Sequence, residues 1–386
     1  MAKSVIGAYG AWAAGLVGTR PPRLSLRRPG SAGGLAAWRK RALARTMQLL
    51  APPAMPAIPQ VRVVERGEYD GVAWEKLSWR LPWGPPTEAV LLKPAHADPG
   101  KKLPAILGLH DHGGRKYFGW RKIAQIGPQV HPHIVAHRAE SYGGLAWANQ
   151  AAKRGFAVLV HDTFPFASRR VRLDETSDFL TAGMKEPVDD DLESIDDYNR
   201  WAAAHESTMA KSLFCAGTTW PGVYLREDQV ALSILAARRE VDATRLVCAG
   251  LSGGGMRTVF LAGVDPRIRC CACVGFMTTW RDFTLNVSPR HTWMTYLPLA
   301  ANELDFPEIL GLRVPRAVLV QCTRQDQLYS LAGMQAAGRI LRDVYRTAGA
   351  PERCRVSFYD GGHKFDQPMQ DDAFAWFERW LKQESR

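Results

Sequence analysis

The alternation of short apolar runs with helical patterns constrains the fold of this chain most. The runs are Ala105–Leu109, Phe156–Val160, Leu246–Ala249, Cys270–Val274, Ala317–Val320 and a last short one at Val356–Tyr359. Helical patterns at about 144–153, 226–239, 254–263, 331–346 and 371–382 lie between or after them. Continuous apolar runs of this length are typical of strands buried on both faces. The alternation therefore predicts an α/β protein, with a mostly parallel sheet covered by helices on both faces.

The region before residue 105 has a different pattern. Residues 1–60 form a basic arm, in which Leu35, Trp38, Ala42, Met47 and Leu50 recur near helical spacing and predict an amphipathic helix. Val61–Glu65, Val72–Leu81 and Ala89–Leu92 predict antiparallel strands at a sheet edge. The main domain is therefore expected over 61–386. Within it, the aromatic-rich segments 163–225 and 278–312 follow strands and are predicted to be cap insertions.

The net charge of +12 is concentrated in the arm. Residues 1–64 contain ten basic residues and no acidic one, which leaves about 12 − 10 = +2 for the rest of the chain. We expect the arm to pack on an acidic face of its own body or of a second subunit, with phosphate groups or an anionic membrane as the alternative. No zinc-finger spacing or RNA-binding signature accompanies it, so no nucleic-acid partner is predicted. The sequence leaves a homo-oligomer open.

Targeting signals and cysteines bear on the compartment. The uncharged run from Val5 to Gly18 is 14 residues, shorter than the ~20 that a membrane-spanning helix needs. Lys3 and this run resemble a signal peptide, but a small-x-small cleavage site is missing. Five of the seven cysteines fall in or beside apolar runs and are interpreted as reduced core thiols. The prediction is a cytoplasmic protein, with secretion or organelle import left open.

The strongest chemical signal is the sequence Gly250-Leu251-Ser252-Gly253-Gly254. It directly follows the apolar run 246–249 and precedes a helical pattern. In a strand–turn–helix setting, G-x-S-x-G forms a tight turn that exposes the serine hydroxyl at the edge of the sheet. The backbone N–H of Gly253 is then available to a developing oxyanion. A glycine-rich turn that only packs closely or binds phosphate is the alternative reading.

A serine nucleophile needs a base and an acid that orients the base. Asp326 lies just after the run 317–320, and His363 lies in a Gly-Gly-His loop after the last short run. Ser252, Asp326 and His363 therefore stand in the order serine, acid, histidine, each beyond a predicted strand end. We predict that they form a catalytic triad. Asp360 is the alternative acid.

The second oxyanion donor is expected in the loop after the run 105–109. This loop reads His110-Asp111-His112-Gly113-Gly114. Glycines there bring backbone N–H groups close to the serine. We predict the N–H of His112 as the donor, with Gly113 as the alternative.

With these motifs in place, the chain resembles the α/β-hydrolase superfamily, in particular its acetyl xylan esterase-like branch, which is related to dienelactone hydrolases. The resemblance covers roughly residues 35–386 and rests on the 110–114 loop, the run Arg239–Asp242, the 250–254 turn, Asp326 and the 361–363 loop. It implies an α/β-hydrolase fold and a serine carboxyl-ester hydrolase without a cofactor, acting on acylated sugars or small esters. The oxyanion loop of that branch commonly reads H-G-x, so Asp111 is a departure.

Other groupings have simpler explanations. His131, His133 and His137 lack a metal-site pattern, so we predict cleft or surface histidines and no metal. The acidic run Asp189–Glu193 is interpreted as a solvated helix start, with docking of the basic arm as an alternative. Several aromatic residues of the two insertions are predicted to form cap core, with one or two facing the serine: Phe164, Phe166, Phe179, Trp201, Phe214, Trp220, Trp280 and Trp293.

Taken together, the sequence predicts a serine hydrolase that cleaves small carboxylic esters of the short-acyl or acylated-sugar type. An amidase or peptidase with the same triad is an alternative. A catalytically idle α/β-hydrolase scaffold that acts as a binding protein is another, although the three triad residues are all present. Which side chains bind the substrate is left open, because pocket walls rather than the fold determine specificity.

Overall fold

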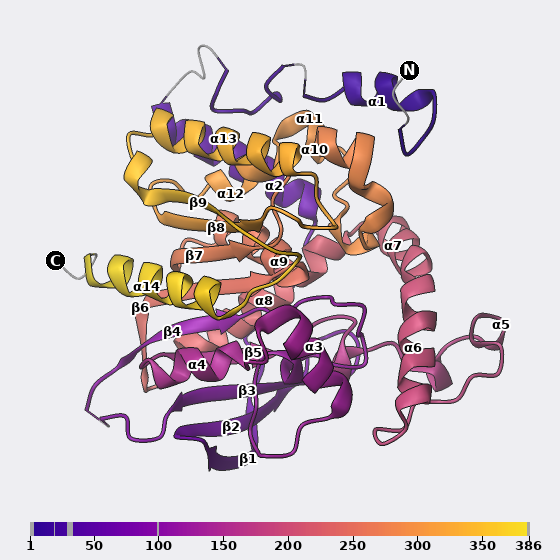
Figure 1. Ribbon diagram of the computed structural model, residues 1–386, viewed down its shortest axis with the longest axis vertical. Helices are drawn as coiled ribbons and strands as arrows, with labels where there is room; N and C mark the ends of the chain where they lie inside the picture. The colour runs from indigo at the N-terminus through magenta and orange to yellow at the C-terminus, as the bar shows by residue number, and fades with distance from the viewer. Residues whose placement is uncertain (1–3, 19, 29–33, 99, 384–386) are drawn as a thin grey trace.

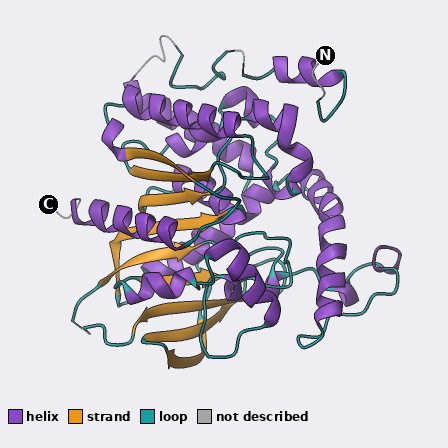
Figure 2. Ribbon diagram, in the orientation of Figure 1, coloured by secondary structure: helices purple, strands orange, loops and turns teal. Residues whose placement is uncertain are grey.

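A nine-stranded sheet runs through the described part of the molecule (Figures 1 and 2). The computed structural model describes residues 4–18, 20–28, 34–98 and 100–383. The strand order is β1-β2-β3-β5-β4-β6-β7-β8-β9. The strands are β1 Arg62–Tyr69, β2 Val72–Trp79, β3 Thr87–Pro94, β4 Leu103–Gly108, β5 Ala157–His161, β6 Val241–Leu251, β7 Ile268–Val274, β8 Ala317–Thr323 and β9 Cys354–Tyr359.

The sheet has an antiparallel edge and a parallel remainder. β1, β2 and β3 pair antiparallel in sequence, and β3 is also antiparallel to β5. All pairs from β5 through β4, β6, β7 and β8 to β9 are parallel. The predicted mostly parallel sheet with antiparallel edge strands is therefore confirmed. The first strand, however, extends to Tyr69 rather than ending at Glu65, because it forms a hairpin with β2 through Asp70 and Gly71, both with positive φ.

The chain reverses its direction of travel across the sheet at β4. From β4 it moves outward to β5, and it then returns to place β6 on the other side of β4. Loops that follow two adjacent strands on opposite sides of such a switch point open a crevice at the carboxyl ends of the strands. The loop 110–114 and the turn at Ser252 follow β4 and β6 respectively, so both lie at this crevice.

Helices cover both faces of the sheet. The helices are α1 Tyr9–Gly15, α2 Gly34–Leu50, α3 Pro132–Tyr142, α4 Trp147–Lys153, α5 Asp178–Thr181, α6 Leu192–Ala204, α7 Glu206–Cys215, α8 Trp220–Ala236, α9 Gly253–Val264, α10 Trp280–Asp282, α11 Ala300–Glu303, α12 Phe306–Gly311, α13 Leu331–Thr347 and α14 Gln367–Gln383. Buried side chains of α2, α8, α9, α12 and α13 belong to one core cluster, and those of α4 and α14 belong to the other. In Figure 1, α4 and α14 lie in front of the sheet.

The continuous apolar runs divide between these two cores residue by residue. Leu107 and Leu159 pack in the first cluster, and their neighbours Ile106 and Val158 pack in the second. The alternation follows from the two-residue repeat of a strand. It also sends Cys271 and Cys273 to one face and Cys270 to the other, as expected for core thiols.

The basic arm docks on acidic residues of its own chain. Arg23 and Arg45 each bond Glu303, with Nε–Oε distances of 2.7 and 3.0 Å. Arg27 Nε lies 3.0 Å from Glu308 Oε1. The prediction that the arm packs on an acidic face of its own body is therefore confirmed for these residues. Within the acidic run, Asp189 pairs with Arg121 of the main domain, at 3.2 Å.

Three helix predictions were wrong at their starts. α14 begins at Gln367, four residues before the expected position 371. α8 begins at Trp220, six residues before the expected start, because the Thr219 hydroxyl accepts from Gly222 N and Pro221 occupies the first turn. The predicted helix 144–153 begins only at Trp147. The preceding helix, α3, ends at Tyr142, and the left-handed residues Gly143 and Gly144 follow it. Within the described ranges, no helix has the length and apolar character needed to cross a bilayer.

Candidate active site

Ser252 occupies a strained turn between β6 and α9. Its backbone angles are φ +58° and ψ −117°, a region that non-glycine residues rarely adopt. A Cβ on Gly250 or Gly254 would clash with the carbonyl oxygen of Leu109 at the end of β4. The glycines therefore let the turn press against β4, and this close approach holds Ser252 at the crevice. Strain of this kind persists only where the surroundings over-determine the conformation, as at catalytic sites.

Asp326 and His363 meet beside this turn. Asp326 follows β8 and His363 follows β9, and Asp326 Oδ2 lies 2.8 Å from His363 Nδ1. The carboxylate is buried, and its Oδ1 also accepts from Leu328 N at 2.8 Å. Because an ionised carboxylate only accepts, Nδ1 carries the imidazole proton and Nε2 keeps its lone pair. Within the described residues, His363 Nε2 has no hydrogen-bond partner.

Ser252, Gly253 and His363 line one cavity of about 330 Å³. Its apolar wall includes Met256, Phe276, Leu328 and Tyr329, and its polar wall includes His112, Glu206, Arg290, His291, Thr292 and Thr295. We call this hollow the catalytic cavity. The aromatic residues expected from the insertions are absent from its described lining. Phe179, expected in the cap core, is instead 83% exposed.

Asp360, the alternative acid, lies outside this arrangement. Its side chain is 87% exposed and contacts Arg324, with Oδ1 and Nε 3.3 Å apart. The described contacts of His363 include none with Asp360. Only Asp326 is therefore in a position to orient the imidazole.

The loop 110–114, which we call the oxyanion loop after its predicted role, approaches the serine turn through its backbone. The amide nitrogen of His112 lies 3.0 Å from the point that a Cβ on Gly253 would occupy. Gly113 and Gly114 both have positive φ, +53° and +66°, which lets the loop double back. The two predicted oxyanion donors, the N–H groups of Gly253 and His112, are therefore neighbours in space.

Lys122 fixes the direction in which the loop amides point. Its fully buried ammonium donates to the carbonyl oxygens of Asp111 at 2.9 Å and His112 at 2.8 Å. In a trans peptide the C=O and the following N–H point in opposite directions. The N–H groups of His112 and Gly113 therefore point away from Lys122. Burial lowers the pKa of Lys122 to about 8.

Asp111, the departure noted in the sequence, faces the protein interior. Its carboxylate accepts from Tyr142 Oη at 2.5 Å and His137 Nε2 at 3.1 Å, and Lys122 Nζ lies 3.8 Å away. Burial alone would raise the pKa of Asp111, but His137 and Lys122 outweigh it and hold the pKa well below its usual value. These contacts of the charged side chain hold the loop against the protein interior. The described lining of the catalytic cavity does not include Asp111.

Glu206 is a wall residue that the sequence analysis missed. It is the first residue of α7, and its carboxylate accepts from His112 Nε2 at 2.8 Å, Lys116 Nζ at 2.5 Å, Thr292 Oγ1 at 2.6 Å and Trp293 N at 3.0 Å. Burial opposes its ionisation, but His112 and Lys116 lower its pKa well below the usual value. Glu206 thereby ties the oxyanion loop to the segment 278–312.

The three histidines considered as a metal site have separate partners. His131 Nε2 bonds Asp189 O at 2.9 Å, and His133 Nε2 lies 3.4 Å from Asp196. His137 bonds Asp111. In the described ranges, no group of three or more His, Cys, Asp or Glu side chains is arranged to hold a metal ion.

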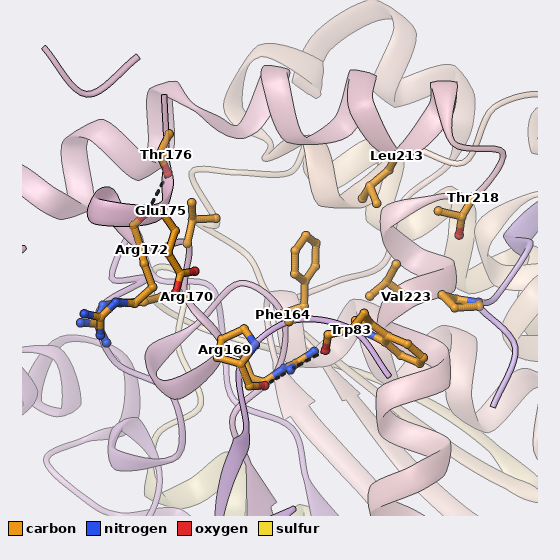
Figure 3. A pocket seen from close by; sticks show the side chains of 14 residues that line it. Trp83, Phe164, Arg169, Arg170, Arg172, Glu175, Thr176, Leu213, Thr218 and Val223 are labelled. Carbon is orange, nitrogen blue, oxygen red and sulfur yellow. Dashed lines mark hydrogen bonds between the residues drawn. The ribbon is translucent and has the colours of Figure 1, made fainter. Parts of the chain in front are cut away.

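A larger hollow, of about 480 Å³, lies elsewhere and is shown in Figure 3. Trp83, Phe164, Leu213 and Val223 line it, and its described lining shares no residue with that of the catalytic cavity. We call it the apolar pocket. It contains threonines but no serine, cysteine or histidine among its described lining residues. The groups able to perform nucleophilic chemistry therefore converge in the smaller hollow.

Comparisons with known proteins agree with this architecture. No protein-family model matches the chain. "Putative hydrolase YtaP" of Bacillus subtilis (strain 168) is 22% identical over 280 residues, which are 72% of this chain and 79% of that protein.

Solved structures are similar over nearly the whole length. A "putative acetyl xylan esterase" from Bacteroides fragilis NCTC 9343 has a TM-score of 0.66 at 18% identity, covering 92% of this chain and 82% of that one. A glucuronoyl esterase from Solibacter usitatus has a TM-score of 0.60 at 16% identity, covering 94% and 98%. Together with the strand order and the serine turn at the end of β6, these similarities show that the chain has the α/β-hydrolase fold.

Proposed function

We propose that this protein is a serine hydrolase of carboxylic esters. Ser252 Oγ attacks the ester carbonyl while His363 Nε2 takes its proton. Asp326 keeps the imidazole in the required tautomer and stabilises the imidazolium that forms. His363 then returns the proton to the leaving alcohol.

The backbone stabilises the charge that develops on the ester oxygen. The N–H groups of Gly253 and His112 are the proposed donors, and Lys122 fixes the orientation of the second. Donors held in place before the reaction need no reorganisation during it, and this is usually the largest contribution to catalysis of acyl transfer. Water activated by His363 then hydrolyses the acyl-enzyme and releases the acid.

The observation that carries the proposal is the pairing of Asp326 with His363 at 2.8 Å beside a strained serine. His363 Nε2 is buried with no partner in the described part of the chain, although buried polar atoms are normally satisfied. A base nitrogen left available in the cavity that holds the serine is what general-base catalysis requires. A scaffold serving only as a binding protein would need neither the available nitrogen nor the strained serine.

The proposed substrates are short-acyl esters, including acylated sugars. The similar structures from Bacteroides fragilis and Solibacter usitatus are named a putative acetyl xylan esterase and a glucuronoyl esterase. The catalytic cavity has the mixed lining that such a substrate needs, with Phe276 and Tyr329 on one side and Arg290 and Thr295 on another. The proposed steps involve only groups of the protein, the ester and one water molecule.

A fluorophosphonate probe tests this proposal directly. The wild-type protein should be labelled at Ser252, and esterase activity on 4-nitrophenyl acetate should disappear as labelling proceeds. Ser252→Ala should abolish both labelling and activity with the fold retained by circular dichroism. Ser212→Ala, at an exposed serine of α7, is the matched control and should behave as wild type. Labelling at another serine, or full activity in Ser252→Ala, would refute the assignment.

A further inference from the structure

The apolar pocket is built as a rigid site although the ester chemistry does not use it. Its walls come from distant segments: Pro53, the turn Trp83–Pro85, residues 164–176, α7 and α8. At about 480 Å³ it is within the range of small-molecule sites and is larger than the catalytic cavity.

Glu227 is the hub that fixes these walls. Only 2% of this residue is exposed. Oε1 accepts from Trp83 Nε1 at 3.0 Å and Arg169 Nη2 at 2.6 Å, and Oε2 accepts from Thr163 Oγ1 at 3.0 Å and Phe164 N at 2.8 Å. Arg169 also donates to the carbonyl oxygens of Trp83 and Pro85. Both aromatic residues of the pocket are thus held before any ligand arrives, which reduces the entropy cost of binding.

The pocket has an apolar end and a polar end. In Figure 3, Leu213, Val223 and Trp83 lie on one side, with the Phe164 ring between them and the far wall. Phe164 is packed against Trp220 at 5.3 Å between ring centroids, which fixes the ring. Arg170, Arg172, Glu175 and Thr176 gather on the opposite side. A ligand that fills the pocket would therefore have an apolar body and a polar head.

The charges at the polar end favour a cationic head. Arg169 is balanced by Glu227. Arg170 pairs with Glu186 at 3.0 Å, and Arg172 lies 3.4 Å from Asp174 and 3.6 Å from Glu186. Glu175 has no hydrogen bond or ion pair from its side chain in the described structure. Asp174 and Glu186 do not belong to the described lining, so they neutralise Arg170 and Arg172 from outside the pocket. Glu175 is the one carboxylate of the described lining.

From this geometry we infer that the apolar pocket binds a small molecule with an aromatic or aliphatic body and a protonated amine. The body packs between Trp83, Phe164 and Leu213, and the ammonium faces Glu175. Recognition of this kind needs no group of the catalytic cavity. The inference is independent of the proposed ester hydrolysis.

Three probes with one body and different heads test the inference: 4-phenylbutylamine, 4-phenylbutanol and 4-phenylbutanoate. Calorimetric titration of the full chain should give the tightest binding for the amine and the weakest for the carboxylate. An exposed ion pair contributes little, so the amine should bind up to about fivefold more tightly than the alcohol. In Glu175→Gln this preference should disappear while the alcohol binds as before.

A second pair of variants locates the site. Leu213→Trp places an indole in the pocket and should weaken binding of the amine at least about tenfold, because each excluded CH₂ equivalent costs roughly fourfold. Ser212→Trp adds the same indole one residue away, at an exposed position outside the described pocket lining, and should leave binding unchanged. Protein labelled at the catalytic serine with fluorophosphonate should bind the amine as the unlabelled protein does.

Three results would overturn the inference. The first is saturable binding that Leu213→Trp does not weaken, which would place the ligand elsewhere. The second is tighter binding of the carboxylate than of the amine, which would make the pocket an anion site. The third is no saturable binding of any probe, which would make the pocket a structural void.

Discussion

The catalytic cavity and the apolar pocket are both lined by residues of α7, and each is organised by a buried glutamate. They differ in which groups are left without a hydrogen-bond partner. α7 contributes its first residue, Glu206, to the cavity and Leu213 to the pocket. Seven residues of helix separate them by about 10 Å. Each hollow is organised by a buried glutamate that accepts four hydrogen bonds, Glu206 in one and Glu227 in the other.

The difference lies in the groups left without a partner. In the catalytic cavity, the bonded groups surround a histidine nitrogen with no described partner and a serine held in a strained turn. In the apolar pocket, the hub fixes aromatic surfaces. The groups of its described lining without a hydrogen-bond partner include the exposed Glu175 carboxylate and the buried Nε atoms of Arg169 and Arg170. A buried charge is costly and adds little net stability, so both hubs are better explained by the positions they enforce. Size alone would have selected the apolar pocket, whose described lining contains neither the proposed nucleophile nor the proposed base.

The largest expected effect separates the two candidate acids of the catalytic cavity. Asp326→Asn should lower kcat on 4-nitrophenyl acetate by ~10⁴, because an amide no longer favours the tautomer with the proton on Nδ1. Asp360→Asn, the control at an exposed position, should stay within about twofold, since a surface pair with Arg324 is worth little. Steady-state kinetics of both variants are the measurement. The reverse ranking would move the acid to Asp360.

The same variant sharpens the comparison between the hollows. Asp326→Asn should bind 4-phenylbutylamine with wild-type affinity, because Asp326 contributes nothing to the described lining of the apolar pocket. A parallel loss of activity and binding would show that the two hollows are one extended site.

A smaller effect is expected from loosening the oxyanion loop. Lys122→Met removes both hydrogen bonds to the loop carbonyls and leaves the Asp111 carboxylate buried with less compensation. Loss of one oxyanion donor typically costs ~10²–10³ in kcat, so a displaced donor should cost about 10². KM should change little, because the interaction acts in the transition state.

Two controls separate this effect from general destabilisation. Melting curves should show that Lys122→Met remains folded at the assay temperature. Lys211→Met, at an exposed lysine of α7, should leave both kcat and KM unchanged. An unaltered kcat in folded Lys122→Met would mean that the loop amides need no anchor.

The acyl-chain profile tests whether the catalytic cavity, at about 330 Å³, limits the length of the acyl group. We expect kcat/KM on 4-nitrophenyl esters to be highest between acetate and butyrate and to fall about tenfold by octanoate. A long open groove would instead add up to ~0.8 kcal/mol for each buried CH₂, roughly fourfold, and the profile would rise steadily. Activity should persist in EDTA. A maximum at eight carbons or beyond, or metal-dependent restoration of activity, would refute this.

The sequence was most informative where strand ends carry motifs. Ser252, Asp326 and His363 could be selected because each lies within about six residues of the end of a predicted strand, and parallel strands bring their carboxyl ends to one edge. The direction of the His112 amide could not be predicted, because it depends on Lys122 and on how that ammonium is buried. Asp111 looked like a defect in the loop motif, and only its contacts with His137 and Tyr142 explain it.

The roles of Glu206 and Glu227 could not be predicted from the sequence, for a related reason. Glu206 is 94 residues from His112, and Glu227 is 144 residues from Trp83. A lone glutamate in a helical pattern has no local signal that distinguishes a buried hub from a solvated residue. Aromatic content was equally ambiguous, since Phe179 is exposed while Phe276 and Tyr329, which were not singled out, line the catalytic cavity.

The smallest expected effect is the strictest test that the two hollows are independent. Leu213→Trp fills the apolar pocket seven residues along α7 from Glu206. If the hollows are separate, its kcat/KM on 4-nitrophenyl acetate should stay within about twofold of wild type, as for surface substitutions generally. If α7 instead transmits the change, Glu206 would shift against His112 and kcat would fall. Kinetics of Leu213→Trp beside Ser212→Trp, with and without saturating 4-phenylbutylamine, distinguish the two. A change in kcat caused by the amine in wild type but absent in Leu213→Trp would show that the apolar pocket regulates the catalytic cavity, because a ligand alters activity only by binding two states unequally.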